Sequence, residues 1–310
     1  VFTATALAAS IATLVMAIMA KLPFALAPGM GLNAFFAFTL VQGMGFSWEA
    51  ALAAVFIEGV VFILLTVFNV RELIVNAIPE TLRHAISVGI GLFIAFLGLQ
   101  KAGLIVADPA TFVSLGEFTP STLLAVGGIV IGGVLVARKV RGALFYAILI
   151  VTVLRIPLGV TRIPENFSFV SLPHSLEPVF FKLDFHSLLS VNMLVALFSL
   201  VFMDIFDTLG TLVGTANKVG MVKPDGSIPK LKPAMMADAI GTTVGALLGT
   251  STTTTYAEST AGIAEGGRSG LTAAVVCVLF LVALFFSPFF LLVPGVATAE
   301  VLVIVGSFMF

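Results

Sequence analysis

The chain has 310 residues, of which 59% are hydrophobic and only 10% are charged. Soluble domains carry about 25% charged residues, so this composition excludes an ordinary soluble enzyme and a disordered chain. The net charge of −1 provides no field to attract nucleic acid, and the single cysteine, Cys277, cannot form an intrachain disulfide. We therefore expect a multi-pass protein of the cell membrane whose outer face contacts the lipid bilayer.

Apolar stretches follow one another along almost the whole chain. A helix that spans the bilayer needs roughly 20 mostly apolar residues. Stretches that fit this requirement, or come close to it, lie at about 1–20, 50–68, 84–106, 120–137, 141–158, 187–216, 234–249, 269–293 and 297–310. Both ends already resemble membrane helix, so we expect the sequence to be part of a longer protein. Most of the 15 Lys and Arg residues fall on one side when crossings alternate, which assigns that side to the cytoplasm.

Two segments between these spans are too apolar or too long for a turn, yet are poor helices. Residues 22–38 carry Pro and Gly, and residues 250–264 carry a run of Thr. Backbone at membrane depth leaves the helix only where it is buried in protein or lines a cavity. The sequence therefore predicts two broken, part-extended segments within a single all-α integral membrane domain over 1–310.

The segment before each predicted break has a similar sequence. Residues 11–20 are IATLVMAIMA and residues 240–249 are IGTTVGALLG. At an offset of 229 residues, the identical pairs are Ile11/Ile240, Thr13/Thr242, Val15/Val244 and Ala17/Ala246. An odd number of spans separates the two copies, so the repeats are expected to be inverted. Inverted repeats with interrupted helices are typical of secondary transporters.

Acidic residues inside the predicted spans mark a candidate site, because a charge at the bilayer centre costs roughly 2.5–3.5 kcal/mol on insertion scales. Asp204 and Asp207 are three residues apart and hence share a helix face. Glu258 lies inside the second broken segment, whereas Glu58 lies in an uninterrupted span and is expected to serve packing or hydrogen bonding between helices. We expect Asp204 to orient Asp207. A buried carboxylate accepts N–H donors and can carry a proton, which suits a small, flat, neutral solute that bears N–H groups.

The motifs PFALAPGMGLNAFF, FMDIFDTLGTLVGTANKVGM and TSTTTTYAESTAGIAEGGRSGLTA, together with their order, resemble those of the AzgA-like purine permeases. These are proton symporters of the nucleobase–ascorbate transporter superfamily. The resemblance implies fourteen segments in two inverted repeats of seven, of which this chain lacks the first and the last two. It also implies core elements at about 1–68 and 187–293 that move against gate elements at about 84–158 and 297–310. A homodimer in the cell inner membrane is implied as well.

The resemblance further implies which residues bind the substrate. Asp207 and Glu258 fall where related uracil permeases carry substrate-binding glutamates on segments eight and ten, and Asn33 lies on segment three. Thr208, Ser259 and Thr255 are neighbours of lower rank. The candidates for proton coupling are Asp207, Glu258 and Asp204. No metal or cofactor other than the coupling proton is expected.

The resemblance leaves several functions open. The expected function is proton-coupled import of purine nucleobases, with hypoxanthine and guanine favoured because an ionised carboxylate accepts their N1–H. Adenine, or an inorganic anion as in the related sulfate family, is the alternative solute. A passive channel is a further possibility. A membrane-embedded enzyme is disfavoured, since the sequence contains neither a nucleophile–base arrangement nor metal-ligand spacing.

Overall fold

The computed structural model describes residues 1–70, 73–74, 79–158, 167–186, 188–218, 220–221, 228–293 and 295–307. They form two compact units. The first unit is Val1–Ile86 with Leu172–Phe285, and the second is Ser87–Ser171 with Phe286–Phe310. Residues 286–293, expected with the core elements, belong to the second unit. The roles of core and gate stay predictions.

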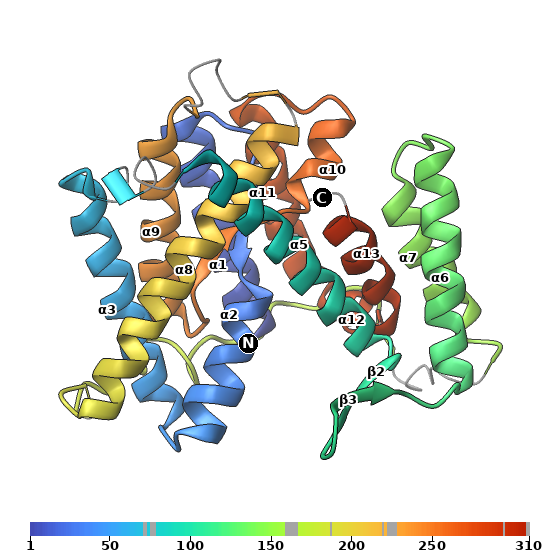
Figure 1. Ribbon diagram of the computed structural model, residues 1–310, viewed down its shortest axis with the longest axis horizontal. Helices are drawn as coiled ribbons and strands as arrows, with labels where there is room; N and C mark the ends of the chain where they lie inside the picture. Colours follow the sequence, from blue (N-terminus) through green and yellow to red (C-terminus); the bar gives the residue numbers. More distant parts are fainter. Residues whose placement is uncertain are drawn as a thin grey trace. The chain divides into compact units, whose positions relative to one another are not determined.

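The first unit contains the helices and strands of both broken segments (Figure 1). In chain order its elements are α1 (Phe2–Val15), the π-helix η1 (Met16–Ala20), β1 (Leu26–Pro28), α2 (Met30–Ala34), the π-helix η2 (Phe35–Gly43), α3 (Trp48–Val67), α8 (Val191–Lys218), α9 (Leu231–Leu248), β4 (Thr253–Thr255), α10 (Ser259–Ala264) and α11 (Gly270–Phe285). Helix α9 packs against both α1 and α3, and α3 also packs against α8.

The two broken segments meet in a short antiparallel ladder. Its three residue pairs are Leu26–Thr255, Ala27–Thr254 and Pro28–Thr253. The N–H of Gly29 donates to the carbonyl oxygen of Thr252 at 3.1 Å, and the N–H of Tyr256 donates to that of Ala25 at 2.9 Å. Each strand follows a long helix and precedes a short one, so the order helix–strand–short helix occurs twice. The part-extended character expected of 22–38 and 250–264 is present in β1 and β4.

A residue in the left-handed conformation ends each long helix before its strand. Helix α1 widens into the π-helix η1, after which Lys21 adopts a left-handed conformation with φ of 56°. Helix α9 ends at Gly249, whose φ of 92° favours glycine. A Cβ atom at Gly249 would also lie 2.6 Å from the Cβ of Val179. The chain therefore leaves the helix at defined points rather than fraying.

Small residues bring α1 and α9 close together. A Cβ atom added at Gly241 would lie 2.6 Å from the Cβ of Ala12, so these helices touch where the internal repeat pairs two small residues. Buried apolar side chains from both broken segments and their neighbouring helices form one cluster around this contact, including Met16, Phe24, Leu26, Phe62, Leu212, Met235 and Ile263. The ladder, including the threonine strand β4, thus lies inside a packed core.

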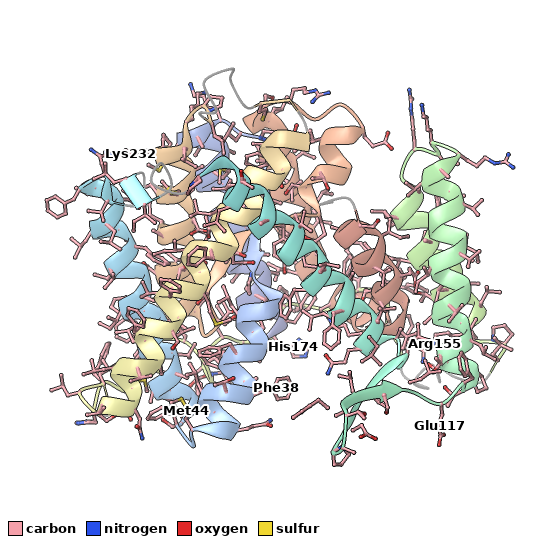
Figure 2. The ribbon with its side chains drawn as sticks, viewed as in Figure 1. Phe38, Met44, Glu117, Arg155, His174 and Lys232 are labelled. Atoms are coloured by element: carbon pink, nitrogen blue, oxygen red, sulfur yellow. The ribbon has the colours of Figure 1, made fainter. Side chains whose placement is uncertain are left out.

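The second unit contains α5 (Glu80–Lys101, which begins in the first unit), β2 (Ile105–Asp108), β3 (Phe112–Leu115), α6 (Pro120–Ala137), α7 (Ala143–Leu154), α12 (Ser287–Leu292) and α13 (Gly295–Ser307). Helices α6, α7 and α13 pack on one another. Figure 2 shows Glu117 and Arg155 at the same end of the α6–α7 pair, where Arg155 donates to the Ser121 hydroxyl at 3.4 Å.

The structure corrects two expected spans. The predicted span 84–106 is helical only as far as Lys101, because the chain then turns into the β2–β3 hairpin. The Asp108 carboxylate accepts N–H bonds from Ala110 and Thr111 at 2.8 and 2.9 Å, which closes the hairpin turn and holds the pKa of Asp108 below its usual value. The predicted span 269–293 is divided at Phe286, after which α12 begins at Ser287 with Pro288 in its first turn.

Four helices among the described residues are long and apolar enough to cross a bilayer. They are Phe2–Ala20, Trp48–Val67, Pro120–Ala137 and Val191–Ala216. Shorter apolar helices are Gly91–Lys101, Ala143–Leu154, Gly270–Phe285 and Gly295–Ser307. The chain is thus a multi-pass membrane protein, as its composition indicated.

Candidate functional site

The threonine run of the second broken segment connects the ladder to two acidic side chains. Thr252 donates its hydroxyl hydrogen to Glu58 Oε2 at 2.7 Å, and the Thr254 hydroxyl lies within hydrogen-bonding range of the Asp207 carboxyl group. Side chains alternate between the two faces of a strand, so Thr252 and Thr254 belong to one face. Thr255, a predicted site residue, belongs to the opposite face. The run therefore presents every second hydroxyl to the acids of α3 and α8.

The structure places Asp207 of α8 and Glu258 of the second broken segment near the same side chain, Tyr256. Tyr256 lies two residues after Thr254 and interacts electrostatically with both Asp207 and Glu258. Both acids are half-buried. The Tyr256 hydroxyl donates to the carbonyl oxygen of Pro28 at 2.7 Å, so the first broken segment fixes the position of the ring. The two acids predicted from the sequence thus share one polar region in the first unit.

Glycine at position 29 lets the two broken segments approach closely here. A Cβ atom at Gly29 would lie 2.9 Å from Thr254 Oγ1, the hydroxyl oxygen that faces Asp207. Any side chain at this position would push the threonine away from the acid. The PGMG sequence therefore has a packing reason at the centre of the candidate site.

Asn33 and Ser259 occupy the short helices that follow the strands. Asn33 lies in α2, and its side-chain oxygen accepts a hydrogen bond from the Ser251 hydroxyl. Since the oxygen accepts, the amide N–H groups of Asn33 are the donors it can offer to a ligand. Ser259 begins α10, and its hydroxyl oxygen accepts the N–H of Ala25 at 3.0 Å. Ser259 therefore ties the two broken segments together.

Thr208 lies between two buried carboxyl groups. Its hydroxyl oxygen is 3.2 Å from Asp204 Oδ1 and 3.1 Å from Asp238 Oδ2, and all three side chains are fully buried. One hydroxyl hydrogen can be donated to only one of these two oxygens at a time. Asp204 of α8 is thus connected through Thr208 to Asp238 of α9.

Sequence reasoning left three members of this region out of the predicted site. Glu58 was expected to act between helices, yet its carboxyl group accepts from the broken segment. Asp238 was not singled out, although it is an acid within the helix that precedes the break. Tyr256 was passed over, although it is one of only two tyrosines in the chain and lies two residues before Glu258. Among the described residues, no group of three or more His, Cys, Asp or Glu is arranged to hold a metal ion.

A membrane protein in which two interrupted segments from related halves cross beside buried acids has the architecture of a secondary transporter. The sequence profile described as "Permease family" matches residues 1–310 in full. The chain belongs to this family, and it is a transporter rather than an enzyme. Together with the relatives described next, this match confirms the resemblance to nucleobase permeases.

Similar proteins come from both archaea and bacteria. The chain is 49% identical to a putative permease of Methanocaldococcus jannaschii, 44% identical to the guanine/hypoxanthine permease PbuG of Bacillus subtilis and 41% identical to the adenine permease AdeP of Escherichia coli. Each match covers 100% of this chain and 71%, 70% and 69% of the respective relative.

A solved structure supports the fold. The transmembrane domain of the cyanobacterial bicarbonate transporter BicA matches with a TM-score of 0.68 over 97% of this chain and 80% of that chain, at 18% identity. At this identity the match concerns the fold alone. The predicted all-α transporter fold with two broken segments is confirmed.

Proposed function

We propose that this protein imports purine nucleobases in symport with protons, and that it prefers hypoxanthine and guanine to adenine. Two of the relatives above are named as a guanine/hypoxanthine permease and an adenine permease, which supports a purine as the solute. The observation that carries the proposal is that Asp207, which bonds to Thr254 of β4, and Glu258, three residues after the end of β4, both lie at the crossing of the two broken segments.

The chemistry of this region fits one edge of a 6-oxopurine. Hypoxanthine and guanine carry an N1–H beside the C6 carbonyl, and guanine adds a 2-amino group. An ionised carboxylate of Glu258 or Asp207 accepts N1–H, and in guanine also the amino N–H, as a bidentate charge-assisted pair. The amide of Asn33, whose oxygen is occupied by Ser251, offers N–H donors for the carbonyl group. Thr208, Ser259 and Thr255 are the substrate-binding residues of lower rank, and the hydroxyl groups of Thr208 and Ser259 already bond within the protein.

Adenine is the alternative solute that the comparisons favour most. Its N1 is an acceptor and would face an ionised carboxylate, which is also an acceptor. Its 6-amino group is a donor and would face the N–H donors of the Asn33 amide. A buried polar group left without a partner costs about 1–3 kcal/mol. Adenine therefore requires a protonated acid or another edge of the base. An inorganic anion is less favoured, since it would face two acids.

Proton coupling and alternating access complete the proposal. Asp207, Glu258 and Asp204 are the candidates for the proton carrier, because each lies inside the first unit at the crossing or beside it. The division into two compact units supports an elevator-like motion of core against gate. A homodimer and residence in the cell inner membrane belong to the same proposal.

Uptake of radiolabelled hypoxanthine by cells that express the complete protein and lack their own purine permeases tests this proposal. We expect uptake that guanine competes strongly and adenine weakly, and that falls when a protonophore removes the proton gradient. Glu258→Gln and Asp207→Asn are each expected to lower kcat/KM by at least about a hundredfold, the effect of losing roughly 3 kcal/mol of a charge-assisted bond. Unchanged uptake by both variants would overturn the site, and stronger competition by adenine than by guanine would overturn the proposed preference.

A further inference from the structure

The short ladder of β1 and β4 leaves some backbone groups pointing outward. In an antiparallel pair, hydrogen-bonded and non-bonded residue pairs alternate. The residue pairs of the ladder and the flanking bonds at Gly29 and Tyr256 make Ala27–Thr254 the bonded pair at the centre. Leu26 and Thr253 consequently turn their N–H and C=O groups away from the partner strand. Because Leu26 and Thr253 are fully buried in the first unit, water does not reach those groups.

One threonine closes each outer edge with two hydrogen bonds. Thr13 accepts the N–H of Leu26 at 2.9 Å and donates to its carbonyl oxygen at 3.0 Å. Thr242 accepts the N–H of Thr253 at 3.2 Å and donates to its carbonyl oxygen at 2.9 Å. A hydroxyl is the smallest side-chain group that both donates and accepts. Both threonines are fully buried.

The two contacts are equivalent in the two repeats. Thr13 and Thr242 are one of the identical pairs at the offset of 229 residues. Each lies on the long helix that precedes its own strand, and each binds the first residue of that strand, Leu26 or Thr253. The same chemistry at matched positions of both halves indicates a shared role in holding the strands.

We propose that Thr13 and Thr242 are positioning residues for the substrate site, and this proposal rests on the function proposed above. By fixing the first residue of each strand they set where the rest of the strand lies. Thr254, which faces Asp207, follows Thr253 directly, and Glu258 follows the end of β4 by three residues. Asn33 follows the end of β1 by five residues. A strand that slides along its helix would separate these groups from one another.

The test compares valine and serine at both positions in the complete protein. Valine has the shape of threonine without the hydroxyl, whereas serine keeps it. We expect Thr13→Val and Thr242→Val each to raise KM for hypoxanthine by about tenfold while Vmax changes by less than about twofold. Thr13→Ser and Thr242→Ser are expected to restore the parental KM. Thr66→Val is the matched control, because the buried Thr66 hydroxyl donates only within its own helix, to Phe62 at 2.7 Å.

Hydrogen–deuterium exchange on the purified protein provides a readout that does not depend on the solute. The amide of Leu26 is expected to exchange faster in Thr13→Val, and that of Thr253 faster in Thr242→Val, with no change in Thr66→Val. Unaltered exchange and KM in both valine variants would overturn the positioning role, as would a valine variant absent from the membrane while its serine counterpart accumulates. If the parent does not transport hypoxanthine, the proposed function fails, while exchange still decides whether the threonines hold the strands.

Discussion

The hydrogen bond between Thr252 and Glu58 links the threonine run of the second broken segment to helix α3. Glu58 is fully buried in α3, and Thr252 donates to it at 2.7 Å from the second broken segment. A hydrogen bond to a buried carboxyl group contributes more than one between neutral groups, since desolvation of the acid is costly. We therefore expect Thr252 to stabilise the chain and not merely to occupy space.

Replacement of Thr252 by valine tests this contribution. Thr252→Val is expected to lower the free energy of unfolding by about 1–3 kcal/mol, because Glu58 Oε2 loses a donor while the side-chain volume is kept. Thermal unfolding in detergent measures the change. The control is Thr243→Val, since the Thr243 hydroxyl donates only to the carbonyl oxygen of Ala239 in its own helix. Equal melting temperatures for the two variants would contradict the stabilising role of the Thr252 bond.

At the scale of elements, close approach of helices depends on glycines that face a neighbour. In the second unit, a Cβ atom at Gly98 of α5 would lie 2.8 Å from the carbonyl oxygen of Ala299 and 3.0 Å from the Cβ of Leu302 in α13. Gly89 of the same helix has no atom within 4 Å of the corresponding position. Close packing of α5 on α13 therefore requires glycine at position 98, whereas no neighbouring atom requires it at position 89.

Alanine at these two positions separates packing from helix propensity. Gly98→Ala is expected to destabilise the protein by about 1–3 kcal/mol, because the backbone of α13 must shift to accept a methyl group. Gly89→Ala is expected to leave stability unchanged or to raise it by up to about 1 kcal/mol, since alanine favours helix. Melting temperatures of the two variants in detergent decide this. A Gly98→Ala protein as stable as Gly89→Ala would contradict the α5–α13 contact.

For the whole molecule, orientation in the membrane follows from the basic residues. Helix α6 has 18 residues and is about 27 Å long at 1.5 Å per residue, close to the roughly 30 Å of the hydrocarbon core. Glu117 precedes this helix and Arg138 follows it, and both side chains are exposed. Arg138 lies on the side that collects most of the basic residues, which is expected to be cytoplasmic.

Cysteine labelling tests this topology. The native Cys277 is removed as Cys277→Ala, and its buried thiol, 3.2 Å from the Ser10 hydroxyl oxygen, explains why it would react slowly in any case. A membrane-impermeant maleimide is expected to label Glu117→Cys in intact cells and Arg138→Cys only in inside-out vesicles. Arg138→Cys keeps Lys139 and Arg141 as the neighbouring basic residues. Labelling from the opposite sides would reverse the assigned orientation.

Parts of the fold and of the candidate site could be predicted from local sequence. Spans such as 120–137 were predicted nearly to the residue, since apolar length alone sets them. The hairpin at 105–115 was missed because Ile105 and Val106 extend the apolar run while the side chain of Asp108 closes the turn. Thr208 was chosen for its place beside Asp207. Its contact with Asp238 could not be foreseen, because the two residues are 30 positions apart on different helices.

The sequence by itself determined that the chain crosses a membrane repeatedly and that two segments are broken. It also determined that Asp207 and Glu258 are acidic residues within segments predicted to lie in the membrane. These are properties of composition and periodicity, which each stretch of chain carries alone. Only the tertiary structure decided that Thr252 and Thr254 of the threonine run face Glu58 and Asp207, and that Thr13 and Thr242 close the outer edges of the ladder. The reason is that buried polar groups must find partners, and in a lipid core those partners come from whichever segments the packing of α1, α3, α8 and α9 brings together.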